Sequence, residues 1–276
     1  MIYRRSRVRV AIAVECVLAV AACHAGAGSG APADAASVAP ADAASEPDGS
    51  SAPAGIDFSI WSLQLPTGSG TSPTTIPPAT LVGGYTDAYF YVASDGGQAF
   101  MDPQTGIATS GSEHCRTELR EETTGGQPAA WPSTGSNTLA VAGEVVQVGG
   151  GSAGKVTVGQ VFNSTDSIPL AELQYSTDLA GFQLLYEEAK GAGTSIDLQT
   201  PVALGTRYTF TLALADGVLT VELDGHQVYT HAVSAAIAVK SFYFKLGDYD
   251  QTATAGAIST TPYTIVEAFS ARVMHP

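Results

Sequence analysis

Hydrophobic and polar residues alternate with a period of two along most of the chain after residue 55, and no long stretch repeats with the helical period. Successive side chains of a strand point to opposite faces of its sheet, so this alternation indicates β-strands. We predict ten of them, at residues 89–93, 116–122, 138–148, 155–162, 182–186, 207–215, 218–223, 227–231, 241–246 and 263–273.

Two dipeptides predict the turns that join three of these strands. Asp216-Gly217 and Asp224-Gly225 lie between alternating runs, where a type I′ turn requires positive φ at both central residues. They indicate a three-stranded antiparallel meander. Many strands at short spacing, with glycine-rich turns, favour an all-β fold: a jelly-roll-like sandwich of two antiparallel sheets, one of them curved into a concave substrate cleft.

The first part of the chain differs in composition from the rest. Four arginines followed by the apolar run AIAVECVLAVAA indicate a signal peptide over residues 1–22. Cys23 follows Val-Ala-Ala, as in a lipobox, so we expect either a lipidated Cys23 or ordinary cleavage. Residues 23–54, rich in Ala, Pro and Ser, predict a disordered linker, and residues 55–276 one catalytic domain. The protein is expected to be exported, as a periplasmic, outer-membrane-anchored or secreted protein.

The charge of the chain limits its partners. Its 12 Lys and Arg stand against 26 Asp and Glu, for a net charge of -14, which excludes nucleic-acid binding because phosphate neutralisation needs clustered basic residues. Cys115 would be left without a disulfide partner once Cys16 leaves with the signal peptide and Cys23 carries lipid. No His, Asp and Cys cluster has metal-ligand spacing, so we expect no metal and no cofactor. We also expect a monomer that contacts a membrane only through a lipid anchor.

The alternation places polar residues of three strands on shared faces. His114, Arg116, Glu118 and Arg120 point one way, and Cys115, Thr117 and Leu119 the other. Tyr243 and Lys245 lie opposite the apolar Phe242, Phe244 and Leu246, with Tyr249 and Gln251 following in register, and Gln160 shares a face with Phe162. Taken alone, this pattern is equally typical of a surface charge ladder, worth about 0.2–1 kcal/mol per cross-strand pair.

Three motifs in order distinguish these interpretations. The chain contains Arg116-Thr117-Glu118-Leu119-Arg120, then VGQVF around Gln160, then YFKLGDYDQ at residues 243–251. Together with FSIWSLQLP at the start of the domain and the closing Ala271-Arg272-Val273, they resemble the alginate lyases of polysaccharide lyase family 7. The resemblance runs over nearly the whole domain.

The resemblance implies a role for each motif residue. Arg116 and Gln160 match residues that bind and neutralise the substrate carboxylate, and Tyr249 matches the catalytic tyrosine. Substrate-binding positions that line the cleft or hold its residues in place are matched by Glu118, Arg120, Lys245 and Gln251. One position departs from the family, because its histidine, two residues after the glutamine, is Phe162 here.

The implied reaction is β-elimination in a 1,4-linked polyuronate. The tyrosine is expected to act as a base if positive charge from Arg116 or Lys245 favours its phenolate. Without the family's histidine, Tyr249 alone would favour mannuronate-type blocks, with His114, on the same predicted strand face as Arg116, as an assisting catalytic residue or a mere surface histidine. Two alternatives stay open: a lyase for glucuronan or another polyuronate, and a non-catalytic carbohydrate-binding sandwich. His226 and His231 are expected to face solvent.

Overall fold

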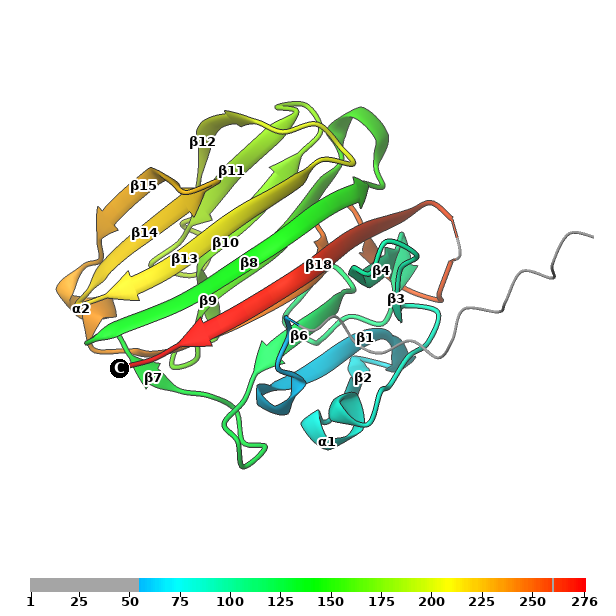
Figure 1. Cartoon of the computed structure of the whole chain (residues 1–276), viewed down its shortest axis with the longest axis horizontal. Coiled ribbons are helices and arrows are strands. Elements are labelled where there is room, and N and C mark those ends of the chain that lie inside the picture. The colour runs from blue at the N-terminus through cyan, green and yellow to red at the C-terminus, as the bar shows by residue number, and fades with distance from the viewer. Residues whose placement is uncertain (1–54, 260) are drawn as a thin grey trace, which may run out of the picture. The chain divides into compact units, whose positions relative to one another are not determined.

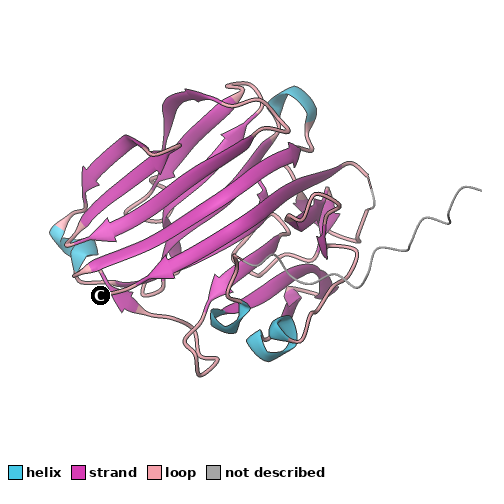
Figure 2. Cartoon of the chain, in the orientation of Figure 1, coloured by secondary structure: helices cyan, strands magenta, loops and turns pink. Residues whose placement is uncertain are grey.

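The folded part of the chain consists almost entirely of β-strands. The structure, a computed structural model, describes residues 55–259 and 261–276; the predicted signal peptide, lipidation site and linker lie outside them. Two antiparallel sheets are stacked on each other (Figure 1), with short helical segments only in the connections (Figure 2). These segments are η1 (Phe58–Ile60), α1 (Pro78–Val82), η2 (Gly151–Ala153) and α2 (Ala235–Ala238). None of the helices in this part of the chain is long and apolar enough to cross a membrane.

The first sheet carries the candidate site and is called the cleft sheet below. Its strands run in the order β12 (Thr194–Pro201), β11 (Gly181–Tyr186), β10 (Ile168–Ser176), β9 (Lys155–Asn163), β16 (Ser241–Asp250), β6 (Thr117–Glu121), β1 (Trp61–Ser69) and β2 (Ser72–Ile76), and the short β7 (Trp131–Pro132) also pairs with β16. Strands β9, β16 and β6, which hold the three motifs, are therefore direct neighbours although they are distant in sequence.

The second sheet covers the inner face of the cleft sheet. Its order is β15 (His226–Ala232), β14 (Val218–Leu223), β13 (Arg207–Ala215), β8 (Ser136–Gln147), β18 (Tyr263–Met274), β4 (Gln98–Pro103) and β3 (Phe90–Val92). A separate parallel pair joins β5 (Thr105–Gly106) to β17 (Thr254–Ala255). The predicted meander is β13–β14–β15, and φ is positive at all four turn residues, Asp216 to Gly217 and Asp224 to Gly225.

The hydrophobic core lies between the two sheets. Phe242, Phe244 and Leu246 of β16 are at most 1% exposed, as their predicted parity requires. The sheets approach closely at Gly159, where an added Cβ would lie 2.8 Å from the ring of Phe210 on β13. A larger residue at this point of β9 would push the sheets apart, so the glycine helps to fix the position of the neighbouring Gln160.

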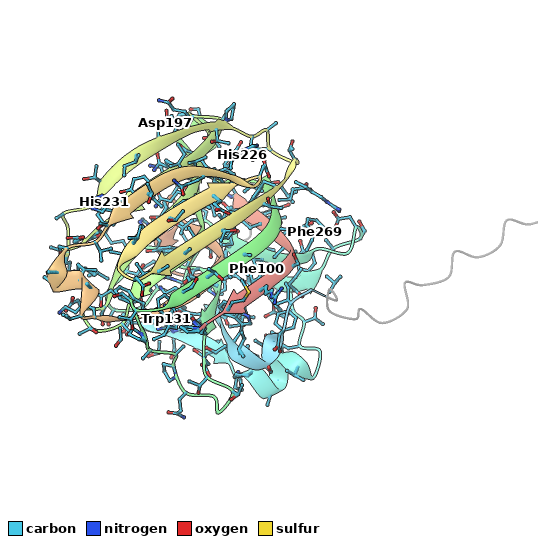
Figure 3. The ribbon with its side chains drawn as sticks, turned by 60° about the vertical axis from the view of Figure 1, so that its left-hand side comes forward. Phe100, Trp131, Asp197, His226, His231 and Phe269 are labelled. Atoms are coloured by element: carbon cyan, nitrogen blue, oxygen red, sulfur yellow. The ribbon has the colours of Figure 1, made fainter. Side chains whose placement is uncertain are left out.

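All ten predicted strands are present, two of them (β13 and β14) with the predicted bounds and eight with shifted ends, and the all-β sandwich is confirmed. Strand β16 runs four residues further than predicted, to Asp250, through a bulge at Gly247, whose φ is +143°. Strand β10 was not predicted, although its residues 171–176 alternate between apolar and polar side chains. Cys115 is buried and unpaired within the described residues, and His226 and His231 on β15 are exposed (Figure 3).

Candidate active site

The three motif strands bring their polar side chains to one face of the cleft sheet. Lys245 of β16 is the direct partner of Arg120 on β6 and of Gln160 on β9, so these residues form a row across three strands. Their side chains border a cleft of about 720 Å³. The cleft is also lined by His114, Arg116, Phe162, Tyr243, Tyr249 and Gln251, so it gathers all the predicted site residues except Glu118.

Glu118 lies beneath the floor of this cleft and holds the residues above it. It is 1% exposed. One carboxylate oxygen lies 3.3 Å from Nη1 of Arg116 and 3.6 Å from Nζ of Lys245, and the other accepts a hydrogen bond from the Gln160 amide. Of the two roles expected for Glu118, lining the cleft or holding its residues in place, its burial fits the second. Its observed role is to orient Arg116, Lys245 and Gln160, since one buried carboxylate fixes all three donors.

Burial also affects the charge of Lys245. Desolvation lowers the pKa of Lys245 to about 7, although the carboxylate of Glu118 opposes this shift. Its Nζ lies 3.9 Å from the ring centroid of Phe162 and 5.9 Å from that of Tyr243. Phe162 thus contributes an aromatic face to the cleft wall, where it contacts a lysine. Arg120 completes this wall and donates a 2.7 Å hydrogen bond to the Tyr243 hydroxyl.

Tyr249 is surrounded by Arg116 and by a residue that the sequence analysis missed. The Arg116 guanidinium carbon lies 3.7 Å from the centroid of the tyrosine ring. The Tyr249 hydroxyl is 2.9 Å from Oγ of Ser112, which also accepts a 2.8 Å hydrogen bond from Nη2 of Arg116. Ser112 lies in the turn before β6, where no alternation marks its direction. Its hydroxyl therefore links Arg116 to Tyr249 through hydrogen bonds.

The charge of Arg116 acts on Tyr249 in the expected direction, but burial outweighs it in the free cleft. Burial raises the pKa of Tyr249 above its usual value of 10, and this effect outweighs the opposing effects of Arg116 and of the hydrogen bond with Ser112. Lys245 points to Phe162 and Glu118 instead. The tyrosine is therefore a neutral phenol at neutral pH, and its proton must leave before it can act as a base.

His114 reaches the cleft from a different position than predicted. Strand β6 begins at Thr117, so His114 lies in the preceding turn and not on a strand face. Its Nδ1 faces the carbonyl oxygen of Ala253, and its ring centroid is 5.9 Å from that of Tyr249. Since a carbonyl only accepts, Nδ1 carries a hydrogen.

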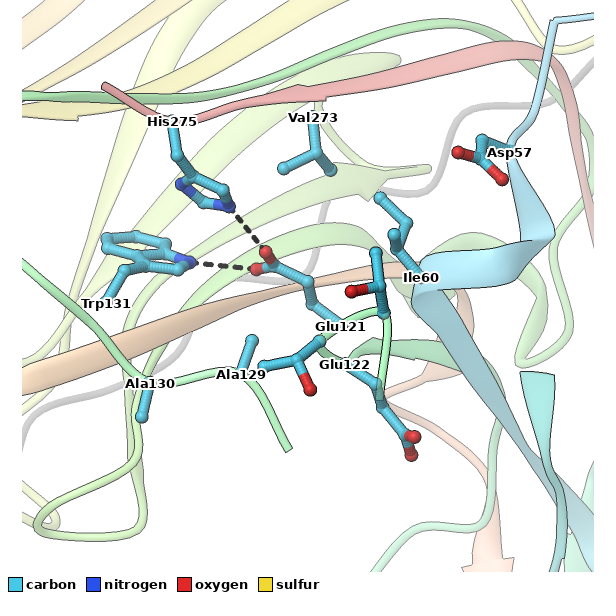
Figure 4. Close-up of a pocket in the computed structure, with 11 residues that line it drawn as sticks. Asp57, Ile60, Glu121, Glu122, Ala129, Ala130, Trp131, Val273 and His275 are labelled. Carbon is cyan, nitrogen blue, oxygen red and sulfur yellow. Dashed lines mark hydrogen bonds and ion pairs between the residues drawn. The ribbon is translucent and has the colours of Figure 1, made fainter. Parts of the chain in front are cut away.

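A second pocket, of about 480 Å³, shares no lining residue with the cleft (Figure 4). Its charged lining consists of Asp57, Glu121, Glu122 and the partly exposed His275, with no Lys or Arg among the lining residues. Glu121 is held by hydrogen bonds from Trp131 and His275. A pocket with three carboxylates is unsuited to an anionic polymer, whereas the cleft contains Arg116, Arg120 and Lys245.

Comparison with known families agrees with the geometry of the cleft. The profile of the family described as alginate lyase matches residues 56–275. The chain belongs to the alginate lyase family. Its members are polysaccharide lyases, and this membership favours an enzyme over the non-catalytic carbohydrate-binding sandwich. Among curated proteins no sequence matches the chain.

Solved alginate lyases share the fold. The chain is 27% identical to alginate lyase PA1167 from Pseudomonas aeruginosa, with a TM-score of 0.71 over 80% of this chain and 100% of that one. It is 29% identical to alginate lyase A1-II′, a member of polysaccharide lyase family 7, with a TM-score of 0.69 over 80% and 96%. A tyrosine-to-phenylalanine variant of A1-II′ is known with the product GGG. A second variant, in which a histidine is also changed to asparagine, is known with the substrate GGMG.

Proposed function

We propose that this alginate lyase family member cleaves mannuronate-rich polyuronate chains by syn β-elimination, with Tyr249 as the proton carrier. The observation that carries the proposal is the contact between the Arg116 guanidinium and the Tyr249 ring, 3.7 Å apart, in a cleft of about 720 Å³. That volume lies within the range of ligand sites in proteins. The complexes of the related A1-II′ with GGG and GGMG support an alginate oligosaccharide as the ligand of the cleft in this chain.

Arg116 and Gln160 prepare the substrate for proton loss. The C5 proton of a uronate is weakly acidic because the adjacent carboxylate resists further negative charge. A guanidinium and an amide N–H at that carboxylate stabilise the charge as it develops. Glu118 holds both side chains, so their positions are set before the substrate arrives.

Tyr249 then transfers one proton from carbon to oxygen. After its own proton has passed to water, its phenolate oxygen takes the C5 proton, the C5–H electron pair becomes the C4–C5 double bond, and the C4–O4 bond breaks with its electron pair on O4. The departing O4 receives the proton from Tyr249, and the new non-reducing end is a 4,5-unsaturated uronate. Ser112 and Arg116 favour the phenolate, since both lower the pKa of Tyr249 against the effect of burial.

The stereochemistry follows from the groups that surround Tyr249. In mannuronate the C5 proton and O4 lie on the same side of the sugar, so one group can serve both. In guluronate they lie on opposite sides, and a second proton carrier is required. Phe162, two residues after Gln160, offers none. His114 assists by adjusting the proton affinity of Tyr249, which is 5.9 Å away between ring centroids.

The test compares initial rates on polymannuronate, polyguluronate and glucuronan, followed by the ultraviolet absorbance of the unsaturated end. We expect the highest rate on polymannuronate. A clear preference for polyguluronate would contradict the syn mechanism, and a preference for glucuronan would move the substrate to another polyuronate. His114→Ala should be slower than the wild type, and an unchanged rate would remove His114 from the mechanism.

A further inference from the structure

A second buried carboxyl, Glu172, lies on the cleft face and has no role in the mechanism above. Strand β10 places it directly opposite Gln160 on β9 and Leu185 on β11. The residue is 4% exposed and belongs to the lining of the cleft. Gln160 is proposed to bind the carboxylate of an anionic polymer. An ionised Glu172 beside it would repel that polymer, so the presence of an acidic residue at this position needs an explanation.

Hydrogen bonds fix one end of the Glu172 side chain. Its Oε2 accepts from Oγ1 of Thr157 at 3.1 Å and from Nε2 of Gln174 at 2.8 Å. Gln174 is in turn fixed by a 2.7 Å hydrogen bond that its Oε1 accepts from Gln183. All these donors are uncharged. Within the part of the chain that the structure describes, the other oxygen, Oε1, makes no hydrogen bond, and it remains for a group in the cleft.

Glu172 differs in this respect from Glu118. Glu118 forms ion pairs with Arg116 and Lys245, whereas no Lys, Arg or His among the described residues lies within ion-pair distance of Glu172. A buried carboxylate without a cation is strongly disfavoured, and protonation removes the charge.

The charged groups around Glu172 come from each neighbouring element. Lys245 and Tyr249 face it from β16. Glu118 faces it from β6, and Arg116 from the turn before β6. Glu187, which follows β11, lines the same cleft. Strand β9 contributes only the uncharged Thr157 and Gln160. Burial raises the pKa of Glu172, and Glu118 adds to this effect, while Lys245 and Arg116 oppose it.

We propose that Glu172 is a specificity-determining residue that is protonated when the polyuronate binds, donates its proton in a hydrogen bond to a substrate oxygen through Oε1, and repels the polyanion once it is ionised. The proposal rests on the proposed function, since it assigns a role at the same cleft. It also accounts for an acidic group among the basic side chains that receive an anionic substrate. A protonated carboxyl is a hydrogen-bond donor, which a carboxylate is not.

The proposal predicts how binding depends on pH. If only the protonated form binds, the dissociation constant of the oligosaccharide rises by up to about tenfold per pH unit above the pKa of Glu172. Bound polyanion adds negative charge near Oε1, so binding is accompanied by proton uptake in that pH range. Glu172→Gln keeps an oxygen for Thr157 and Gln174 and places an uncharged donor at the other end.

The experiment measures binding of a mannuronate oligosaccharide to Tyr249→Phe, the parent protein, by calorimetry across pH, because this parent holds the ligand uncleaved. We expect the affinity of the parent to fall as pH rises. When the parent also carries Glu172→Gln, we expect the affinity at high pH to stay within about threefold of the value at low pH. Two further variants of the parent are controls. Lys245, with its pKa of about 7, loses its charge as the pH rises, whereas the arginine of Lys245→Arg stays charged. Glu187→Gln removes another carboxyl that lines the cleft. Both should retain the fall in affinity.

Each other outcome contradicts a specific statement. A flat pH profile in the parent overturns the proposal without any variant, and so does a fall that persists in Glu172→Gln or disappears in Lys245→Arg. Affinity that Glu172→Gln weakens at every pH would show that the carboxylate itself binds, which also overturns it. In all these cases binding of the oligosaccharide leaves the proposed function intact, whereas a parent that binds no polyuronate contradicts both.

Discussion

Ser112→Ala removes the hydroxyl that connects Arg116 to Tyr249. Its Oγ lies 2.9 Å from the Tyr249 hydroxyl and 2.8 Å from Nη2 of Arg116. A hydrogen bond to a charged group contributes about 1.5–3 kcal/mol. If that bond forms with the phenolate as the reaction proceeds, its loss lowers kcat/KM by about 10- to 150-fold, since each 1.36 kcal/mol is a factor of about ten.

The pH profile separates this role from a structural one. The hydrogen bond with Ser112 lowers the pKa of Tyr249. Without it more of the tyrosine stays protonated at a given pH, so the acid limb of the rate profile moves to higher pH. Ser112→Thr keeps the hydroxyl and should restore both rate and profile. The reasoning would be refuted by a Ser112→Ala enzyme with the wild-type rate and profile, or by a folded Ser112→Thr enzyme as impaired as the alanine variant.

Three further predictions follow from charge. The domain from residue 55 carries a net charge of about -13 and binds a polyanion, so the rate should rise with moderate salt, which screens repulsion beyond about 10 Å at 0.1 M; a rate that falls steadily from very low salt would refute this. Burial, and the nearby Asp95, raise the pKa of Glu267 to about 7. Between pH 4.5 and pH 7 the folded state therefore binds a proton that the unfolded state does not, and folding stability falls as pH rises through this range. Glu267→Gln should therefore raise the Tm relative to wild type above pH 7 but not below pH 4.5, and an equal gain at both would contradict the assignment. His275→Ala removes the 2.6 Å hydrogen bond to Glu121 (Figure 4) and the 2.8 Å hydrogen bond to Asn137. It should lower the Tm by about 2–8 °C, from about 1–2 kcal/mol, while the exposed Arg272→Ala, as control, should leave the Tm unchanged.

The alternation pattern predicted those site residues that lie on regular strands. Arg120, Gln160 and Lys245 face the cleft because parity follows directly from the period of two, and their row across three strands follows from the register. The pattern also separated Phe242 and Phe244 from the polar face of the same strand. Family resemblance then joined strands that periodicity alone could not bring together.

Residues outside regular alternation could not be predicted in this way. Ser112 lies in a turn, where the direction of a side chain depends on local backbone geometry. Glu172 lies on β10, where an irregularity in strand pairing between Pro169 and Ala171 limits the regular alternation to residues 171–176. The direction of the Tyr249 pKa shift depends on the balance between burial and the Arg116 charge, which is a three-dimensional quantity. The sequence indicated that Arg116 would lie near Tyr249, but it did not indicate how deeply Tyr249 is buried.

The measurement that tests the central claim most directly compares the wild type with Tyr249→Phe on polymannuronate. Product formation is followed by the ultraviolet absorbance of the 4,5-unsaturated end, and oligosaccharide binding by calorimetry. We expect a rising absorbance with the wild type and little or none with Tyr249→Phe, while both proteins bind the oligosaccharide, because the substitution removes only the proton-carrying hydroxyl. A folded Tyr249→Phe protein that forms unsaturated product at the wild-type rate, or a wild type that forms none from any polyuronate, would contradict the account.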